Sequence, residues 1–221
     1  MDFDAARQAM VDCQLATNNV LSERVLQAMG TIPREVFLPE GKRASAYLDE
    51  DILIGEGRYM MEPMVIGRMI QALEPRPTDI ALDVGGGSGY SAAVLSTMVE
   101  TVIALEPHDM LRQYAVKMWS DLDLCNIADI DGDSIETAVR NGPYDIIFVN
   151  GAVHEVPKLL TMQLREETGR MVCVLRENPK GSGKVVLVER APGHDDPCVF
   201  PLFDANVPYL YEFAPKEHFS F

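Results

Sequence analysis

Long hydrophobic runs are missing from this chain of 221 residues. It contains no stretch of 18 apolar residues, so we expect no transmembrane helix and no membrane partner. The first ten residues, MDFDAARQAM, are acidic and polar, without the basic start and apolar middle of a secretory signal. The sequence therefore predicts neither a membrane-spanning nor a secreted protein.

Cysteine is scarce and widely spaced. The four cysteines stand at positions 13, 125, 173 and 198, and no C-x-x-C pair occurs. This spacing argues against the usual zinc and redox motifs, and we expect no metal site. A reducing compartment is the simplest setting for such thiols, so the expected location is cytoplasmic.

Basic residues are outnumbered, with 19 lysines and arginines against 34 acids and a net charge of −15. Such a surface repels phosphate backbones and anionic headgroups, so nucleic acid is not an expected partner. The acidity is interpreted more simply as serving solubility. The apolar content of 47% is enough for a substantial core.

The first part of the chain has the spacing of helices joined by loops. Apolar residues recur at helical intervals over 2–30 and again over 64–73, where Pro63 suits the first turn of the second segment. The stretch 31–58 is rich in proline and glycine, with one short strand expected at 51–54. We expect residues 1–77 to form an N-terminal helical and loop subdomain.

After Thr78 the pattern changes to strands alternating with helices. Such alternation predicts βαβ units, and hence an α/β fold with a doubly wound, mostly parallel, Rossmann-like sheet and helices on both faces. Residues 78–221 are expected to form this second domain, with an antiparallel edge strand near 206–213. The strands are expected at 79–84, 101–105, 127–131, 145–150, 170–175 and 185–190, and the helices at 89–98, 108–121, 134–140 and 156–164.

The stretch 80–90, IALDVGGGSGY, is the most informative part of this domain. An apolar run ends in an acid, and glycines follow before the next apolar segment, which predicts a buried strand, a tight turn and a helix start. Glycine lets the backbone turn sharply and approach a ligand, so a nucleotide-like ligand is expected here. A dinucleotide site requires G-x-G-x-x-G, but Tyr90 stands at the third glycine position. The spacing is instead G-x-G-x-G, with Asp83 two residues ahead of it.

That pattern resembles the first motif of S-adenosylmethionine-dependent methyltransferases, and the form LDVGGGSGYSAAVL resembles the protein-L-isoaspartate O-methyltransferase family in particular. Pieces of the N-terminal part are similar to the same family and are more specific to it than the glycine turn. The resemblance covers nearly the whole chain. It implies a seven-stranded methyltransferase sheet, S-adenosyl-L-methionine as cofactor, and an N-terminal subdomain that covers the active site. The N-terminal pieces are MVDCQL (10–15), RVLQAM (24–29), IPREVF (32–37), AY (46–47) and IGEG (54–57).

Acids at the ends of later strands complete the expected cofactor site. Glu106 ends the second strand of the alternating part, where a carboxylate can accept both ribose hydroxyls. In the resemblance Asp133 faces the adenine amino group, a role that Asp131 could share, and Asn150 lines the cavity below the methionine moiety. The cofactor-binding residues implied are Asp83, Gly85, Gly87, Gly89, Tyr90, Glu106, Asp133 and Asn150.

The chain departs from the family over residues 58–63, which read RYMMEP where the family has QTISQP or similar. The family's serine, which helps to hold the substrate carboxylate, aligns with Met61, whose thioether cannot donate a hydrogen bond. Glu62 adds negative charge, and Arg58 could compensate by binding a carboxylate through its planar fork. Arg58 and Met61 are therefore the candidate substrate-positioning residues.

Three functions stay open at this point. The resemblance favours methylation of isoaspartyl carboxylates in damaged proteins, a reaction that needs no general base because the carboxylate is already ionised and the sulfonium methyl already activated. The altered segment leaves room for a relative with another acceptor, a small molecule or another protein. For a less acidic acceptor, His154 and Glu155 are a candidate base and orienter. The third possibility is a cofactor-binding protein without catalysis.

Overall fold

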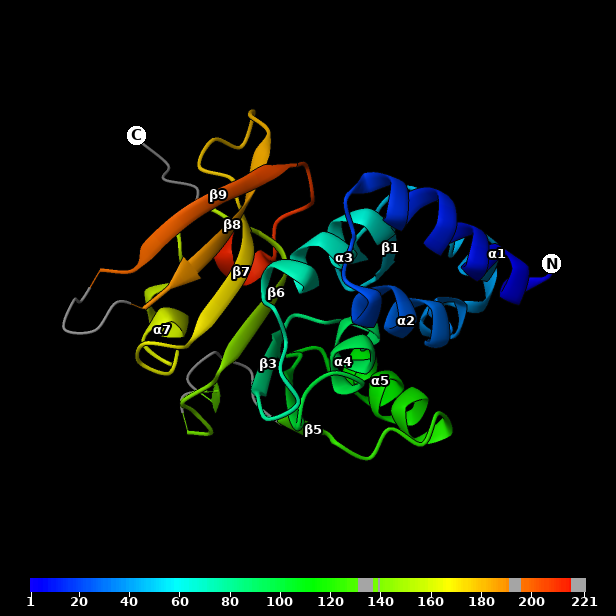
Figure 1. The fold of residues 1–221 in the computed structure, drawn as a ribbon, viewed down its shortest axis with the longest axis horizontal. Helices are drawn as coiled ribbons and strands as arrows, with labels where there is room; N and C mark the ends of the chain where they lie inside the picture. Colours follow the sequence, from blue (N-terminus) through cyan, green and yellow to red (C-terminus); the bar gives the residue numbers. More distant parts are fainter. Residues whose placement is uncertain (131–136, 139, 191–195, 216–221) are drawn as a thin grey trace.

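The computed structural model describes residues 1–130, 137–138, 140–190 and 196–215, and a seven-stranded sheet forms its centre (Figure 1). The strand order is β5-β4-β3-β6-β7-β8-β9, and the first five strands in this order run parallel. The two remaining pairings, β7 with β8 and β8 with β9, are antiparallel. The predicted Rossmann-like methyltransferase sheet is thereby confirmed. The strands are β3 (Ile80–Val84), β4 (Thr101–Leu105), β5 (Ile127–Ile130), β6 (Ile146–Val153), β7 (Arg170–Leu175), β8 (Gly183–Glu189) and β9 (Cys198–Ala205).

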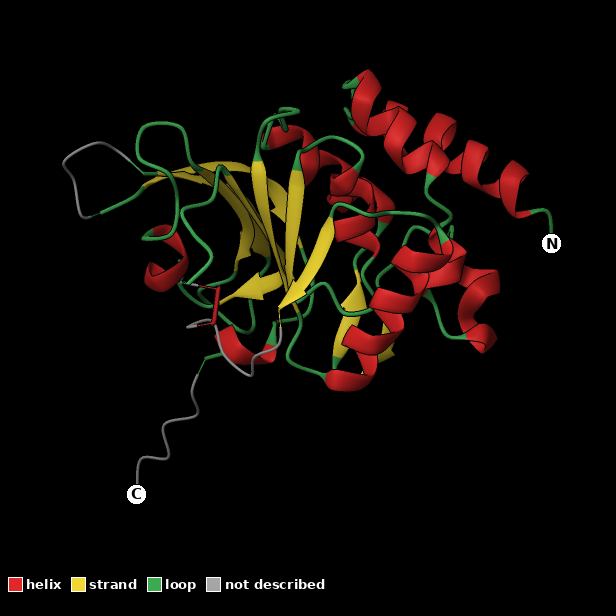
Figure 2. Cartoon of the chain, turned by 90° about the horizontal axis from the view of Figure 1, so that it is seen from below, coloured by secondary structure: helices red, strands yellow, loops and turns green. Residues whose placement is uncertain are grey.

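The central strands are apolar on both faces because both faces are covered. Along β3, Ala81 belongs to the cluster of buried side chains on one face and Leu82 to the cluster on the other. Side chains alternate across a strand, so a continuous apolar run is what a strand buried between two helical layers requires. Figure 2 shows the sheet between helices. The chain winds from β3 outward to β5 and then returns to β6 beside β3, so the strand order reverses next to β3.

Helices lie on both sides of this sheet. The N-terminal helices share one hydrophobic core with α3, α4 and α5, and α7 packs in the cluster on the opposite face (Figure 1). The segment predicted as helix at 156–164 is helical only over α7, and most of the helix predicted at 134–140 lies outside the described residues. None of the described helices has the length and apolar content needed to cross a membrane. The helices are α1 (Phe3–Met10), α2 (Glu23–Thr31), α3 (Pro63–Ala72), α4 (Tyr90–Ser96), α5 (Asp109–Asp121) and α7 (Lys158–Thr161).

The N-terminal helical stretch is divided in two. α1 continues through a π-helical turn (Val11–Leu15) and a 3-10 turn (Ala16–Asn18), and Asn19 then takes a left-handed conformation with φ of 65°. α2 starts afresh after Ser22, which holds the N-cap position without a side-chain hydrogen bond. Two further 3-10 turns, Arg34–Phe37 and Glu40–Ser45, occupy the stretch predicted as loop.

A short hairpin follows and brings residue 58 back toward the sheet. β1 (Ile52–Gly55) confirms the short strand predicted at 51–54, and β2 (Arg58–Met60), which was not predicted, pairs with it in antiparallel fashion. Both turn residues have positive φ, 49° at Glu56 and 71° at Gly57. This is the turn geometry that matches the twist of a two-stranded hairpin.

The prediction of an antiparallel edge strand near 206–213 is wrong. β9 ends at Ala205, and Val207–Phe213 follows as an irregular segment that closes with a 3-10 turn (Tyr211–Phe213). Pro208 has no N–H for a sheet ladder, and the segment bonds instead to the end of β6. The amide of Ala152 donates to the Pro208 carbonyl at 2.9 Å, and the amide of Leu210 donates to the Ala152 carbonyl at 3.0 Å. We call residues 207–213 the strap; in Figure 1 its red end lies next to β6.

Candidate cofactor and active site

The glycine turn leaves the end of β3 and lies against the hairpin. Gly85 and Gly87 have φ of 67° and 57°, a region that favours glycine. A Cβ on Gly87 would lie 2.4 Å from Cδ1 of Ile54, which is too close for any residue other than glycine at position 87. Glycine here lets the hairpin pack directly against the backbone of the turn. The amide of Gly85 donates to the carbonyl of Leu105 at 2.8 Å, which ties the turn to the end of β4.

Asp83, at the end of β3, is buried with 1% of its surface exposed. Its carboxylate accepts hydrogen bonds from Ser91 Oγ at 2.9 Å and from Asn150 Nδ2 at 2.8 Å. Burial raises the pKa of Asp83 to about 7; the two hydrogen bonds act against this shift and the charge of Glu106 adds to it. A carboxyl that titrates near neutrality inside the fold is typical of a functional site.

Glu106, at the end of β4, is also buried and collects several donors. Its carboxylate accepts from the amide of Gly87 at 2.8 Å and from the amide of His108 at 3.1 Å. Nε of Arg58 lies 3.0 Å from one carboxylate oxygen and 3.2 Å from the other. The structure therefore gathers the glycine turn, Asp83, Glu106 and Asn150 at the carboxyl ends of β3, β4 and β6, beside the reversal of strand order where such sheets bind ligands.

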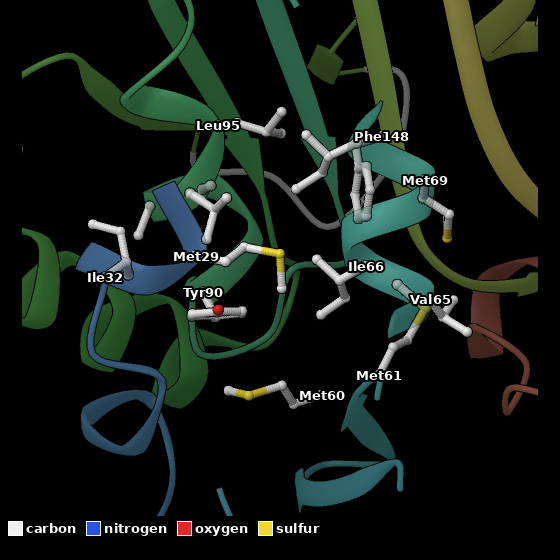
Figure 3. Close-up of a cluster of buried hydrophobic side chains, with 14 of the residues drawn as sticks. Met29, Ile32, Met60, Met61, Val65, Ile66, Met69, Tyr90, Leu95 and Phe148 are labelled. Carbon is white, nitrogen blue, oxygen red and sulfur yellow. The ribbon is translucent and has the colours of Figure 1, made fainter. Parts of the chain in front are cut away.

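One candidate cofactor residue, Asp133, lies outside the described residues, as does Asp131. Another, Tyr90, stands apart from this cluster. Tyr90 starts α4 directly after the turn, but its ring packs in the core between Phe37, 5.7 Å away edge to face, and the guanidinium of Arg34, 5.1 Å from the ring centroid. Figure 3 shows this ring near Met29 and Met60.

Arg58 points its guanidinium at two carboxylates of its own chain and is 2% exposed. Besides the contact with Glu106, Nη1 and Nη2 donate to the two oxygens of Glu212 at 3.0 and 2.7 Å. Burial alone would lower the pKa of Arg58, but Glu212 and Glu106 outweigh it and raise that pKa. The pKa of Glu212 is lowered, because the hydrogen bonds and charge of Arg58 exceed the effect of its own burial. Sequence reasoning missed Glu212, which lies 154 positions from Arg58 and has no motif around it.

The Met61 side chain lies in the apolar core, with 2% of its surface exposed. Figure 3 shows it beside Val65, at the start of α3. Its carbonyl accepts from Nη2 of Arg34 at 2.7 Å. The neighbouring Glu62 has a raised pKa, caused first by burial and then by nearby Asp49 and Asp51.

The alternative acid–base pair lacks the geometry it would need. His154 is half-buried, and its Nδ1 has no hydrogen-bond partner among the described residues. Glu155 is exposed to solvent. A base held by an orienting carboxylate requires a hydrogen bond between the two, and the described part of the chain shows none between His154 and Glu155. Within the same residues, no group of three or more histidines, cysteines or acids is placed to hold a metal ion.

A narrow cavity opens between the turn and α5. Its volume of about 10 Å³ is room for about one water molecule. Asp83, Glu106 and Trp119 are among its lining residues, and Nε1 of Trp119 donates to the carbonyl of Gly89 at 2.9 Å. The hydroxyl of Ser88, in the middle of the turn, is buried without a hydrogen-bond partner among the described residues. A buried hydroxyl without a hydrogen-bond partner is uncommon in native structures, and it is consistent with a surface that binds a polar ligand.

Comparison with known proteins gives a consistent result. Residues 5–194 match the family model described as protein-L-isoaspartate(D-aspartate) O-methyltransferase. A protein-L-isoaspartate O-methyltransferase of Roseiflexus sp. (strain RS-1) is 40% identical over 172 residues, 78% of each chain. A protein-L-isoaspartate O-methyltransferase 2 of Shewanella sediminis is 37% identical over 185 residues, which cover 84% of this chain and 75% of that one.

Solved structures show the same fold. A protein-L-isoaspartate O-methyltransferase superposes with a TM-score of 0.78 at 23% identity, over 92% of this chain and 65% of that one. A putative member from Plasmodium falciparum, in complex with S-adenosyl-L-homocysteine, gives a TM-score of 0.76 at 21% identity, over 93% of this chain and 98% of that one. At this level of identity the likeness establishes the fold, and the sequence matches establish the family. The chain therefore belongs to the protein-L-isoaspartate(D-aspartate) O-methyltransferase family, whose members are S-adenosylmethionine-dependent methyltransferases.

Proposed function

We propose that this protein transfers a methyl group from S-adenosyl-L-methionine to the free carboxylate of isoaspartyl residues in damaged proteins. The observation that carries the proposal is the cluster at the reversal of strand order, where the glycine turn, Asp83 and Glu106 meet in a chain of this family. The expected partner is a protein or peptide that contains isoaspartate. The four free cysteines support a reducing compartment, and a cytoplasmic location is part of the proposal.

The residues present fit the chemistry of the cofactor. The cofactor supplies a methyl group already activated on a sulfonium. Glu106 offers a carboxylate for the ribose hydroxyls. Asp83 of β3 and Asn150 of β6, which are hydrogen-bonded to each other, offer acceptors where the methionine part is expected. Asp133 is proposed for the adenine amino group on the resemblance alone. The full proposed cofactor set is Asp83, Gly85, Gly87, Gly89, Tyr90, Glu106, Asp133 and Asn150.

The work left to the protein is positioning and exclusion of water. An isoaspartyl carboxylate is ionised at neutral pH and needs no base, so the rate depends on holding it in line with the methyl carbon. Arg58, the cation that reaches the cluster from the hairpin, is the proposed carboxylate-positioning residue. Met61 has its side chain in the core, so we propose that it acts only by fixing the backbone of the segment that carries Arg58. Residues 1–77 are proposed as the subdomain that covers the site, and 78–221 as the cofactor-binding domain.

Labelled methyl transfer tests the proposal. An aged protein that has accumulated isoaspartate should accept tritiated methyl groups from S-adenosyl-L-methionine, and the same protein freshly prepared should accept far fewer. Glu106→Gln, which keeps the shape but loses the charged acceptor, should reduce the incorporation at subsaturating cofactor. Equal labelling of aged and fresh protein would point to another acceptor, and no labelling of either would refute the proposal.

A further inference from the structure

The strap crosses the carboxyl edge of the sheet next to the proposed cofactor site. At the end of β6 it is held by the two hydrogen bonds between Ala152 and the strap and by a third, from the amide of His154 to the carbonyl of Phe213 at 2.9 Å. These are main-chain bonds, so they fix the path of the segment whatever its side chains. From β6 the strap passes toward β3 and β4, the strands whose ends carry the glycine turn and Glu106.

Leu210 lies directly on the glycine turn. A Cβ on Gly85 would stand 2.8 Å from Cδ2 of Leu210, and a Cβ on Gly151 would stand 2.9 Å from Cγ. Leu210 is 3% exposed. The backbone surface that glycine opens at the end of β3 is therefore covered by a side chain of the strap.

Glu212 occupies the fork of Arg58. Its two oxygens accept from Nη1 and Nη2, the paired geometry in which a guanidinium binds a carboxylate most strongly. Nε of the same guanidinium contacts both oxygens of Glu106, the atoms that ribose hydroxyls need. Arg58 thus links the strap to the proposed ribose acceptor, which also lines the narrow cavity beside α5.

The two halves of this link stand differently to the family match: Arg58 lies within the matched residues, and Glu212 lies beyond them. The family model ends at residue 194, before the strap begins. Arg58 stands in the segment 58–63, where the sequence departs from the family pattern. The acceptors fit the cofactor, and among the described residues Arg58 lies against Glu106 and Leu210 against the glycine turn.

We propose that Arg58 is a carboxylate receptor whose resting occupant is Glu212, and that a ligand carboxylate must displace Glu212 and lift the strap from the glycine turn before reaction. The ligand carboxylate comes either from the methionine end of the cofactor or from the methyl-accepting side chain. In both cases the pairing of Arg58 with Glu212 competes with the ligand. The observed affinity is therefore the affinity of the open form multiplied by the fraction of molecules in which the strap is open. This inference rests on the proposed function.

Binding to Glu212→Gln tests the proposal and distinguishes the two sources. The substitution keeps the shape of the side chain and removes the charge that holds the fork. Trp119, the single tryptophan, lines the cavity and should report binding of S-adenosyl-L-homocysteine by fluorescence, with calorimetry as a second readout. If the carboxylate comes from the cofactor, the variant binds S-adenosyl-L-homocysteine about tenfold more tightly than the wild type. If it comes from the acceptor, that affinity stays within twofold and an isoaspartyl peptide binds the loaded protein about tenfold more tightly.

Two further variants make the result decisive. Leu210→Ala frees the glycine turn without changing any charge, so it should tighten the same ligand by severalfold. Glu177→Gln changes the same charge at an exposed site and should leave both affinities within twofold. If the wild type binds and both strap variants bind equally well or more weakly, the proposed displacement of the strap is refuted and the proposed function still stands. Absence of binding in the wild type and in the variants would overturn both.

Discussion

Replacing Asp83 with asparagine should remove a large part of the pH dependence of stability between pH 5 and pH 8. In the folded protein burial raises the pKa of this carboxyl from an ordinary value near 3.8 to about 7. Between these two values the folded state holds a proton that the unfolded chain has released. The stabilisation from that proton is therefore full at low pH, declines as the pH rises above about 4, and is gone above about 7.

The size of the effect follows from the two pKa values. Each unit of difference corresponds to about 1.36 kcal/mol. Between pH 5 and pH 7 about two units remain to be lost, so Asp83 should lower the free energy of unfolding by about 2 to 3 kcal/mol over that range. Asparagine does not titrate, and whatever it costs in lost hydrogen bonds with Ser91 and Asn150 is the same at both pH values.

Urea denaturation of wild type and Asp83→Asn at pH 5 and pH 8 measures this contribution directly. All other titrating groups are common to the two proteins, so they cancel in the difference between the two pH dependences. The free energy of unfolding of the wild type should exceed that of the variant by a larger margin at pH 5 than at pH 8. We expect the two margins to differ by about 2 to 3 kcal/mol. Parallel pH profiles for the two proteins would show that Asp83 has an ordinary pKa and would refute the reasoning.

Two further substitutions test the core and the altered segment. Arg170→Ala should cost about 3 to 5 kcal/mol in the free energy of unfolding, because it leaves buried Asp79, now 2.8 Å from Nη2, without its cation; a loss below 1 kcal/mol in urea denaturation would contradict this. Met61→Ser, which introduces the serine that the sequence resemblance led us to expect at this position, should cost about 2 to 4 kcal/mol by removing buried apolar volume. Because the side chain lies in the core, kcat/KM for an isoaspartyl peptide should rise by no more than twofold, and a larger gain would place residue 61 at the substrate.

The sheet was predictable from the sequence because its signals are local. β3, β4 and β7 were predicted to within one residue, since each is an apolar run bounded by turn residues. The C-terminal strand was predicted at 206–213, but the strand that pairs with β8 is 198–205. The apolar pattern over 198–213 does not show which half of this stretch pairs with the sheet. β9 carries exposed side chains such as Phe200 and Leu202, whereas Leu210 in the strap is buried, so apolar character alone pointed to the wrong segment.

The site divides in the same way. Asp83 and the glycine turn lie within a few residues of one another and define a motif, and Glu106 follows from the rule that ligands meet strand ends. The contact between Arg58 and Glu212 joins residues 154 positions apart and depends on how a hairpin and an irregular C-terminal segment meet in space. No local pattern carries that information. Arg58 was expected to bind a substrate carboxylate, and the structure shows it bound to the carboxylates of Glu106 and Glu212.

The most direct test of the central claim is methyl transfer to a matched pair of synthetic peptides that differ only in carrying isoaspartate or aspartate at one position. With S-adenosyl-L-methionine as donor, the account predicts turnover of the isoaspartyl peptide and no measurable turnover of the aspartyl peptide. Equal rates on the two peptides, or no transfer to the isoaspartyl peptide by a protein that binds S-adenosyl-L-homocysteine, would contradict it.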